Sequence, residues 1–155
     1  MSAHTASDVE VTPYFDPTPL PSSIPSVQEV GTTSAPLKSA AFFIGAYCKP
    51  FNEDFMLCKS ENRRPEHCLK EGRKVTRCTT EIIEKIRENC LEEFEQHWKC
   101  LENNNQTFYM CRKPERLLNK CVFTKLGLKK EIPGAPKDQP QIHEKLNPIF
   151  GAIQK

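Results

Sequence analysis

The sequence predicts an all-α fold in which two disulfide-stapled antiparallel helical hairpins follow one another in tandem, with extended N- and C-terminal tails. The 155-residue chain holds eight cysteines, which form four pairs with nine residues inside each pair. On an α-helix ten positions span about 15 Å, so both sulfurs of a pair face broadly the same side of one helix. Only 37% of the residues are hydrophobic, and hairpins of about 30 residues with so little core depend on disulfides or metal. The pairs are Cys48/Cys58, Cys68/Cys78, Cys90/Cys100 and Cys111/Cys121.

Residues 1–36 form a proline-rich N-terminal segment that we expect to be extended, because its prolines exclude a continuous helix. Residues 37–47 are apolar and predict a short helix that begins near Pro36. This helix either packs on the cysteine region or anchors on a neighbouring protein, and the residues leave both readings open.

Residues 48–79 are expected to form the first hairpin. Its first helix runs from about Pro50 to about Lys59, with Phe51, Phe55 and Cys58 recurring at helical spacing on one side. A loop over 60–65 ends at a proline that suits the start of the next helix.

The second helix of this hairpin is predicted to continue to about Asn89, so that residues 80–89 form a bridging extension towards the second hairpin. Its expected apolar side comprises Cys68, Gly72, Val75, Thr79, Ile82, Ile83 and Ile86. Gly72 lies between the two sulfurs, where a missing side chain would permit a close helix approach at a cost of about 1 kcal/mol in helix stability.

Residues 90–126 are expected to form the second hairpin. A helix over about 91–101 has Leu91, Phe94, Trp98 and Leu101 as its apolar face, and the asparagines 103–105 predict a turn. Pro114 leaves two alternatives for the following element: the helix restarts near the proline, or residues 108–111 form a separate turn.

Gly127 is a predicted helix C-cap, and residues 127–155 form an extended C-terminal tail without cysteine. The apolar residues of that tail predict no domain of their own; they are Ile142, Leu146, Ile149, Phe150 and Ile153.

Helix geometry restricts how the cysteines pair. Two sulfurs of one helix are about 15 Å apart, whereas a disulfide needs Cα atoms within roughly 7 Å. In an antiparallel hairpin the outer cysteines face each other and so do the inner ones, which predicts Cys48–Cys78, Cys58–Cys68, Cys90–Cys121 and Cys100–Cys111. On a loop-entropy model each bond contributes roughly 3–4 kcal/mol.

Other site chemistry finds little support in the residues. Structural zinc requires cysteines two to four positions apart, and neither that spacing nor a redox Cys-x-x-Cys occurs, so we expect no metal, cofactor or catalytic residue. The histidines His67 and His97 are expected on helix surfaces. The net charge of +2 is spread over interspersed acids and bases, which argues against a nucleic-acid partner.

The cysteines and the N-terminal residues together predict the compartment in which the protein is located. Residues 1–30 contain neither a secretory signal pattern nor an arginine, and the apolar run 40–47 is too short to span a bilayer. Disulfides without a secretory signal favour the mitochondrial intermembrane space.

The spacing resembles that of the twin Cys-x9-Cys, or coiled-coil-helix-coiled-coil-helix (CHCH), proteins, with two such domains in tandem. The residues between the cysteines resemble the family of 19 kDa (PGIV-type) accessory subunits of respiratory complex I, the mitochondrial NADH:ubiquinone oxidoreductase. The resemblance covers roughly residues 37–130. It rests on residues 55–58 (FMLC), 68–72 (CLKEG), 97–100 (HWKC), 111–113 (CRK) and 121–127 (CVFTKLG).

The resemblance implies a non-catalytic subunit that lies peripherally on the intermembrane-space face of the membrane arm, with other membrane-arm subunits as its partners. It also implies import through a disulfide relay whose receptor binds hydrophobic residues near a cysteine. The candidates for that docking are Phe51, Phe55, Met56, Phe94 and Trp98. Two alternatives share the cysteine pattern: an intermembrane-space assembly factor or chaperone for a respiratory complex, and a thiol oxidoreductase.

Overall fold

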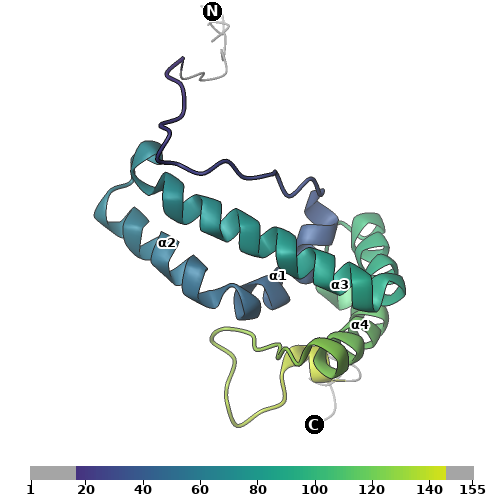
Figure 1. The fold of residues 1–155 in the computed structure, drawn as a ribbon. Coiled ribbons are helices and arrows are strands. Elements are labelled where there is room, and N and C mark those ends of the chain that lie inside the picture. The colour runs from purple at the N-terminus through teal and green to yellow at the C-terminus, as the bar shows by residue number, and fades with distance from the viewer. Residues whose placement is uncertain (1–16, 146–155) are drawn as a thin grey trace, which may run out of the picture.

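The computed structural model describes residues 17–145, and within that range it contains helices and no strand. Figure 1 shows α2 lying antiparallel beside the first half of α3, while α4 lies beside the last part of α3. The predicted all-α fold of two tandem hairpins is therefore confirmed. The longer helices are α1 (Ser34–Tyr47), α2 (Lys49–Glu61), α3 (Leu69–Asn103) and α4 (Arg112–Leu126), and the short 3₁₀ turns are η1 (Pro65–Cys68), η2 (Phe108–Cys111) and η3 (Ile142–Glu144).

Helix α1 begins at Ser34, earlier than the sequence predicts, because Pro36 occupies its first turn rather than its first position. A proline is tolerated there, since the first N–H groups of a helix have no intrahelical partner. The helix buries Ala40 and Phe43 against α3, so the reading in which this helix packs on the cysteine region holds. Val30, in the extended segment before it, packs against the same cluster.

Helix α2 buries none of its residues. It starts at Lys49 with a proline next to it and ends at Glu61, close to the predicted limits. The ring of Phe55 faces Gly72 of α3, whereas Phe51 is 41% exposed. Apolar burial therefore contributes little to holding α2 on the molecule.

Helix α3 is 35 residues long and is broken once, at Cys90, where φ is −137° and ψ is 38°. This break lies at the predicted boundary between the bridging helix and the third helix. It also shifts the helical phase of the residues that follow. Leu91, expected on the apolar face, is 51% exposed, and His97 is buried beside Phe94 and Leu101, so both of those expectations were wrong.

The second hairpin resolves the alternatives around Pro114. Residues Phe108–Cys111 form a separate 3₁₀ turn, and α4 then begins at Arg112. Pro114 is the third residue of α4, where its missing N–H removes no intrahelical hydrogen bond. The helix ends at Gly127, whose φ of +63° makes it the left-handed C-cap that the sequence predicts.

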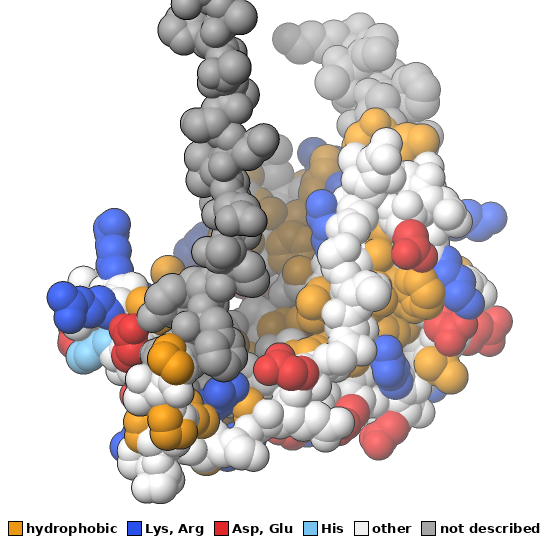
Figure 2. All heavy atoms as spheres, turned by 90° about the horizontal axis from the view of Figure 1, so that it is seen from above, with side chains coloured by type: hydrophobic (Ala, Val, Ile, Leu, Met, Phe, Trp, Pro, Cys, Tyr) orange, Lys and Arg blue, Asp and Glu red, His pale blue; other side chains and the backbone are white. Residues whose placement is uncertain are grey.

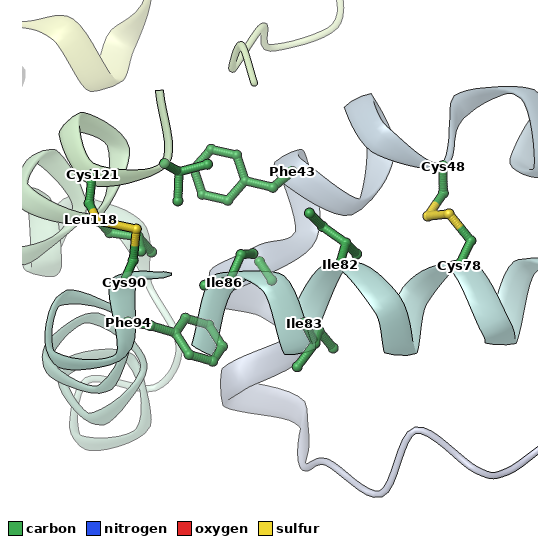
Figure 3. Close-up of a cluster of buried hydrophobic side chains, with 12 residues drawn as sticks. Phe43, Cys48, Cys78, Ile82, Ile83, Ile86, Cys90, Phe94, Leu118 and Cys121 are labelled. Atoms are coloured by element: carbon green, nitrogen blue, oxygen red, sulfur yellow. A yellow bond between two sulfur atoms is a disulfide. The ribbon is translucent and has the colours of Figure 1, made fainter. Parts of the chain in front are cut away.

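The main core lies where α1, the middle of α3 and α4 meet, rather than inside either hairpin. Figure 3 shows its side chains between two disulfides, Cys48–Cys78 at one end and Cys90–Cys121 at the other. All four of these cysteines belong to the buried cluster. Its other members are Ala40, Phe43, Ile82, Ile83, Ile86, Phe94, Leu118 and Val122.

The described part of the C-terminal segment returns to the body instead of running free. Lys130 and His143 are 5% and 3% exposed, and the guanidinium of Arg116 donates to the carbonyl of Lys145 at 2.7 Å. Ile142 is 37% exposed, so it packs less closely than its neighbour His143. The tail residues Leu146, Ile149, Phe150 and Ile153 lie outside the described residues.

The surface carries charges of both signs. Acidic and basic side chains are interspersed over the face shown in Figure 2. Exposed i,i+4 pairs such as Lys99–Glu95, at 2.6 Å, contribute little to stability. No helix among residues 17–145 has both the length and the apolar character needed to cross a bilayer.

We expect Gly72→Ala to stabilise the protein by about 1 kcal/mol, because alanine favours a helix interior. The close helix approach expected at Gly72 is not observed: a Cβ there would lie 3.5 Å from the Phe55 ring, an ordinary contact. The matched control is Gly127→Ala, which should destabilise because alanine is strained at the positive φ of the C-cap. Urea unfolding measures both, and a less stable Gly72→Ala protein would contradict this account of the interface.

Candidate functional site

The structure joins the eight cysteines in the four expected combinations. The bonds are Cys48–Cys78, Cys58–Cys68, Cys90–Cys121 and Cys100–Cys111, with Cα–Cα distances between 5.9 and 6.0 Å. The outer bonds close 30 and 31 residues of chain, and the inner ones close 10 and 11. All eight cysteines lie within the described residues and none is free. The sulfurs therefore act as crosslinks, with no thiolate that could attack a disulfide.

A buried ion cluster, which the sequence analysis missed, fastens the second hairpin to the C-terminal segment. The carboxylate of Glu115 accepts hydrogen bonds from Arg112 Nη1 at 2.5 Å and from Lys130 Nζ at 2.6 Å. The side chains of Glu115 and Lys130 are each only 1% exposed. Two buried charges are costly unless they pair well, so this geometry indicates a specific ion pair that holds the segment after α4 against that helix.

Three phenylalanine rings surround the ammonium group of Lys130. Its Nζ lies 4.9 Å from the centre of the Phe42 ring, 5.3 Å from Phe108 and 5.7 Å from Phe43. Aromatic faces attract a cation through their quadrupole, and the attraction grows when water is excluded. Burial lowers the pKa of Lys130, while the adjacent Glu115 carboxylate opposes that shift. Through these rings and Glu115, the buried Lys130 ammonium group connects the C-terminal segment to α1, η2 and α4.

A weak signal for this cluster was present in the sequence. Glu115 falls at helical spacing from Cys111, Leu118 and Val122, all of which are buried. An acidic residue on the buried side of a helix requires a cationic partner. The sequence alone could not identify Lys130 as that partner, because it lies beyond the end of the helix.

His97 borders the cluster from α3 and is fully buried, contrary to the surface position expected for it. Its Nδ1 is hydrogen-bonded to the hydroxyl oxygen of Ser39 in α1 at 2.7 Å, and its ring lies 5.8 Å from that of Phe108. Burial lowers the pKa of His97 to about 4, although the nearby carboxylate of Glu115 opposes the shift. His97 is therefore a neutral hydrogen-bonding residue that links α1 to α3. His67, in contrast, is exposed as expected.

The five candidate relay-docking residues do not form one surface. Phe51, Phe55 and Met56 belong to α2, and Met56 is 65% exposed. Phe94 and Trp98 belong to the part of α3 beyond the break; Phe94 is 1% exposed and Trp98 is half-buried. Phe55 and Trp98 are both half-buried, so Phe94 is the one of the five that the folded protein hides, and docking through it would have to precede folding.

A hollow of about 360 Å³ lies between the end of α1 and the facing sides of α3 and α4. Its polar groups are already engaged within the molecule: Lys85 Nζ donates to Glu81 at 2.7 Å, and Lys125 Nζ donates to the carbonyl of Asn89 at 2.6 Å. The hydroxyl of Tyr47 also donates to Glu81, at 2.6 Å. This network ties helices together and resembles no nucleophile–base arrangement.

Comparison with known proteins places the chain among respiratory-chain subunits. No protein-family model matches it. It is 55% identical over 138 residues to the NADH-ubiquinone oxidoreductase 20.8 kDa subunit of Neurospora crassa, a match that covers 88% of this chain and 75% of that protein. It is 35% identical over 88 residues to the NADH dehydrogenase (ubiquinone) 1 alpha subcomplex subunits 8-A and 8-B of Arabidopsis thaliana. Those matches cover 57% of this chain and 82% and 83% of the plant proteins.

We expect Lys130→Met to destabilise the protein by about 3 kcal/mol, because it leaves the buried Glu115 carboxylate with Arg112 alone. Adding Glu115→Gln should recover part of that loss, since the remaining side chain is neutral. The control Lys129→Met removes an exposed lysine of the same segment and should change stability by no more than about 0.5 kcal/mol. Urea unfolding of the four proteins tests this, and equal effects of the two lysine variants would show that the buried pair contributes nothing specific.

The protein should lose stability as the pH falls from about 6.5 towards 4. An unfolded His97 takes up a proton below its ordinary pKa of 6.5, whereas the folded protein resists that proton until about pH 4. The stability from this group is complete above pH 6.5, and up to about 3 kcal/mol of it is lost across the window. His97→Gln should flatten the dependence, measured by urea unfolding at several pH values. Burial also lowers the pKa of His143, so part of the slope should remain in His97→Gln. A slope as steep in His97→Gln as in the parent protein would rule out this assignment.

Proposed function

Because the chain belongs to the family of complex I subunits that includes the NADH-ubiquinone oxidoreductase 20.8 kDa subunit, we propose that it is a non-catalytic accessory subunit of mitochondrial complex I. The observation that carries the proposal is the 55% identity over 138 residues, which spans most of both chains. The conversion of all eight cysteines into crosslinks supports a structural rather than a catalytic role. Within the family, we assign the chain to the 19 kDa, PGIV-type subunits on the residues around its cysteines.

The proposed location is the intermembrane-space face of the membrane arm, with the protein peripheral to the inner membrane. Stable disulfides form in oxidising compartments, and the four bonds of this chain support such an address. The family relationship supports a mitochondrial one. Among mitochondrial compartments, the intermembrane space satisfies both conditions.

The proposed mechanical role is that of a clamp on neighbouring membrane-arm subunits. Each hairpin is pinned at two levels, so its helices cannot pivot about a single crosslink. Both hairpins leave large apolar side chains exposed, and such side chains supply the buried anchors of protein interfaces. Those with more than half of their surface exposed are Met56, Leu57, Leu91, Tyr109 and Met110.

We further propose that the relay receptor engages the newly imported chain before the helices pack. Phe51, Phe55 and Met56 lie between Cys48 and Cys58; Phe51 and Met56 are exposed and Phe55 is half-buried, which supports docking at the first hairpin. Phe94 and Trp98 precede Cys100; the burial of Phe94 limits its use to the unfolded chain, whereas Trp98 is half-buried. Oxidation would then fix the pairs in the hairpin order.

Deletion of the protein should reduce the amount of intact complex I, because neighbouring subunits would lose a rigid contact. Blue-native electrophoresis followed by mass spectrometry of the excised complex measures both the amount of the complex and the presence of the protein in it. In wild-type mitochondria the protein should be present in stoichiometric amount with the established subunits.

Two results would contradict this function. Complex I that is fully assembled and active without the protein would remove the structural role. A transient, substoichiometric association with assembly intermediates would instead favour the assembly factor or chaperone. A catalytic thiol exchange would require a readily reduced cysteine pair, and thiol labelling of the isolated complex would detect it.

A further inference from the structure

The tip of the first hairpin brings a histidine and a carboxylate close to its two sulfurs. Cys58 comes from the last turns of α2, and His67 and Cys68 come from the 3₁₀ turn that opposes it. One ligand atom from each of these three residues lies within 4.8 Å of the other two. The carboxylate of Glu71, one turn further along α3, has its Oε2 3.9 Å from the sulfur of Cys58. The spacing of the sulfurs alone predicts no metal here, and the histidine beside Cys68 supplies a ligand that this spacing does not reveal.

In the oxidised protein these sulfurs are bonded to each other and offer no thiolate to a metal. A dithiol reductant changes this: it transfers two electrons and two protons to the disulfide, giving two thiols, and is itself converted to a cyclic disulfide. Zinc then displaces the two thiol protons into solvent and binds the thiolates. We propose that the reduced tip binds one Zn²⁺ through Cys58, His67 and Cys68, with Glu71 as the fourth ligand. Sulfur, imidazole and carboxylate are all ligands of tetrahedral zinc sites.

The second hairpin provides an internal comparison. Its tip has the same two cysteines, Cys100 and Cys111, joined across a similar turn. The residue before Cys111 is Met110, whereas the residue before Cys68 in the first tip is His67. Three positions after Cys111 comes Pro114, whereas Glu71 follows Cys68 by three. The side-chain amide of Asn104 lies 3.6 Å and 3.8 Å from its two sulfurs, and an amide N–H is no zinc ligand. The second tip therefore offers two ligands, whereas the first offers three that lie within 4.8 Å of one another and a carboxylate next to Cys58.

The first tip can be opened without dismantling the fold. The outer bonds Cys48–Cys78 and Cys90–Cys121 lie in the buried core cluster, whereas the first tip lies outside it. Cys68 is 1% exposed but Cys58 is half-buried, so a thiolate would attack this bond at the sulfur of Cys58. Opening Cys58–Cys68 frees a loop of 10 residues and leaves the outer bond of the same hairpin closed. A reductant therefore reaches the tips before the core bonds.

A second carboxylate lies beside the histidine of the site. The Nε2 of His67 lies 4.0 Å from the carboxylate of Glu61. Zinc-ligating histidines typically donate their second ring N–H to such a carboxylate, which orients the ring. His67 is exposed, so the metal has a direct path from solvent.

The test uses the full-length protein, treated with graded amounts of dithiothreitol until alkylation mapping finds thiols at the tips and none at the core cysteines. Zinc binding is then measured by competition with a chromophoric zinc chelator, and Co²⁺ is added in parallel because thiolate ligation gives it a charge-transfer absorption band. We expect one zinc per chain in the reduced protein and none in the oxidised protein. Cys100→Ser/Cys111→Ser should keep this zinc, whereas Cys58→Ser/Cys68→Ser should lose it.

Two single variants separate a built site from a bare cysteine pair. His67→Ala should weaken zinc binding at least about tenfold, while Met110→Ala, the matched change in the second tip, should leave it unchanged. Helical circular dichroism of each partly reduced protein establishes that it is still folded. The proposal is overturned if the first tip cannot be reduced before the core bonds, if its thiols bind no zinc, or if His67→Ala binds zinc as tightly as the parent.

Discussion

Helix α2 buries none of its 13 residues, yet it lies along α3 with its ends fixed. Apolar burial is the usual reason that two helices stay together, and here it is nearly absent on one side of the interface. Two disulfides, one near each end of α2, take over that role. Because each bond limits only the local distance between the two antiparallel helices, both are needed to hold the helices side by side along their length.

Because disulfides hold α2 in place, the apolar contacts of the molecule are made by the other helices. The molecule concentrates its apolar side chains where α1, α3 and α4 meet, and the outer disulfide of each hairpin is part of that cluster. The inner disulfides lie at the hairpin tips, away from it. The second hairpin has a further lock, since the Glu115–Lys130 pair and the Ser39–His97 hydrogen bond fasten the C-terminal segment and α1 to it. The first hairpin therefore projects from the core, whereas the second is built into it.

Much of this arrangement could be predicted from the sequence because it depends on local patterns. The repeated spacing of the cysteines predicts helix pairs and their register, and Gly127 marks the end of α4. The buried polar residues could not be predicted in the same way. The position of His97 depends on the phase shift at Cys90, and the partner of Glu115 lies 15 residues away beyond a helix end. The periodicity of a helix shows which of its faces is apolar. It does not show which distant charged residue will pair with a charged side chain on that face.

The clamp role that we propose requires helices that keep their arrangement without a deep core, and disulfides between the helices provide this. Amide hydrogen exchange can test the claim that the crosslinks, rather than packing, hold α2. The measurement compares the oxidised protein with a variant in which Cys48, Cys58, Cys68 and Cys78 are all serine. We expect residues 49–61 to lose their protection in the variant while residues 112–126 keep theirs. Protection of residues 49–61 that survives the loss of both bonds would contradict the account.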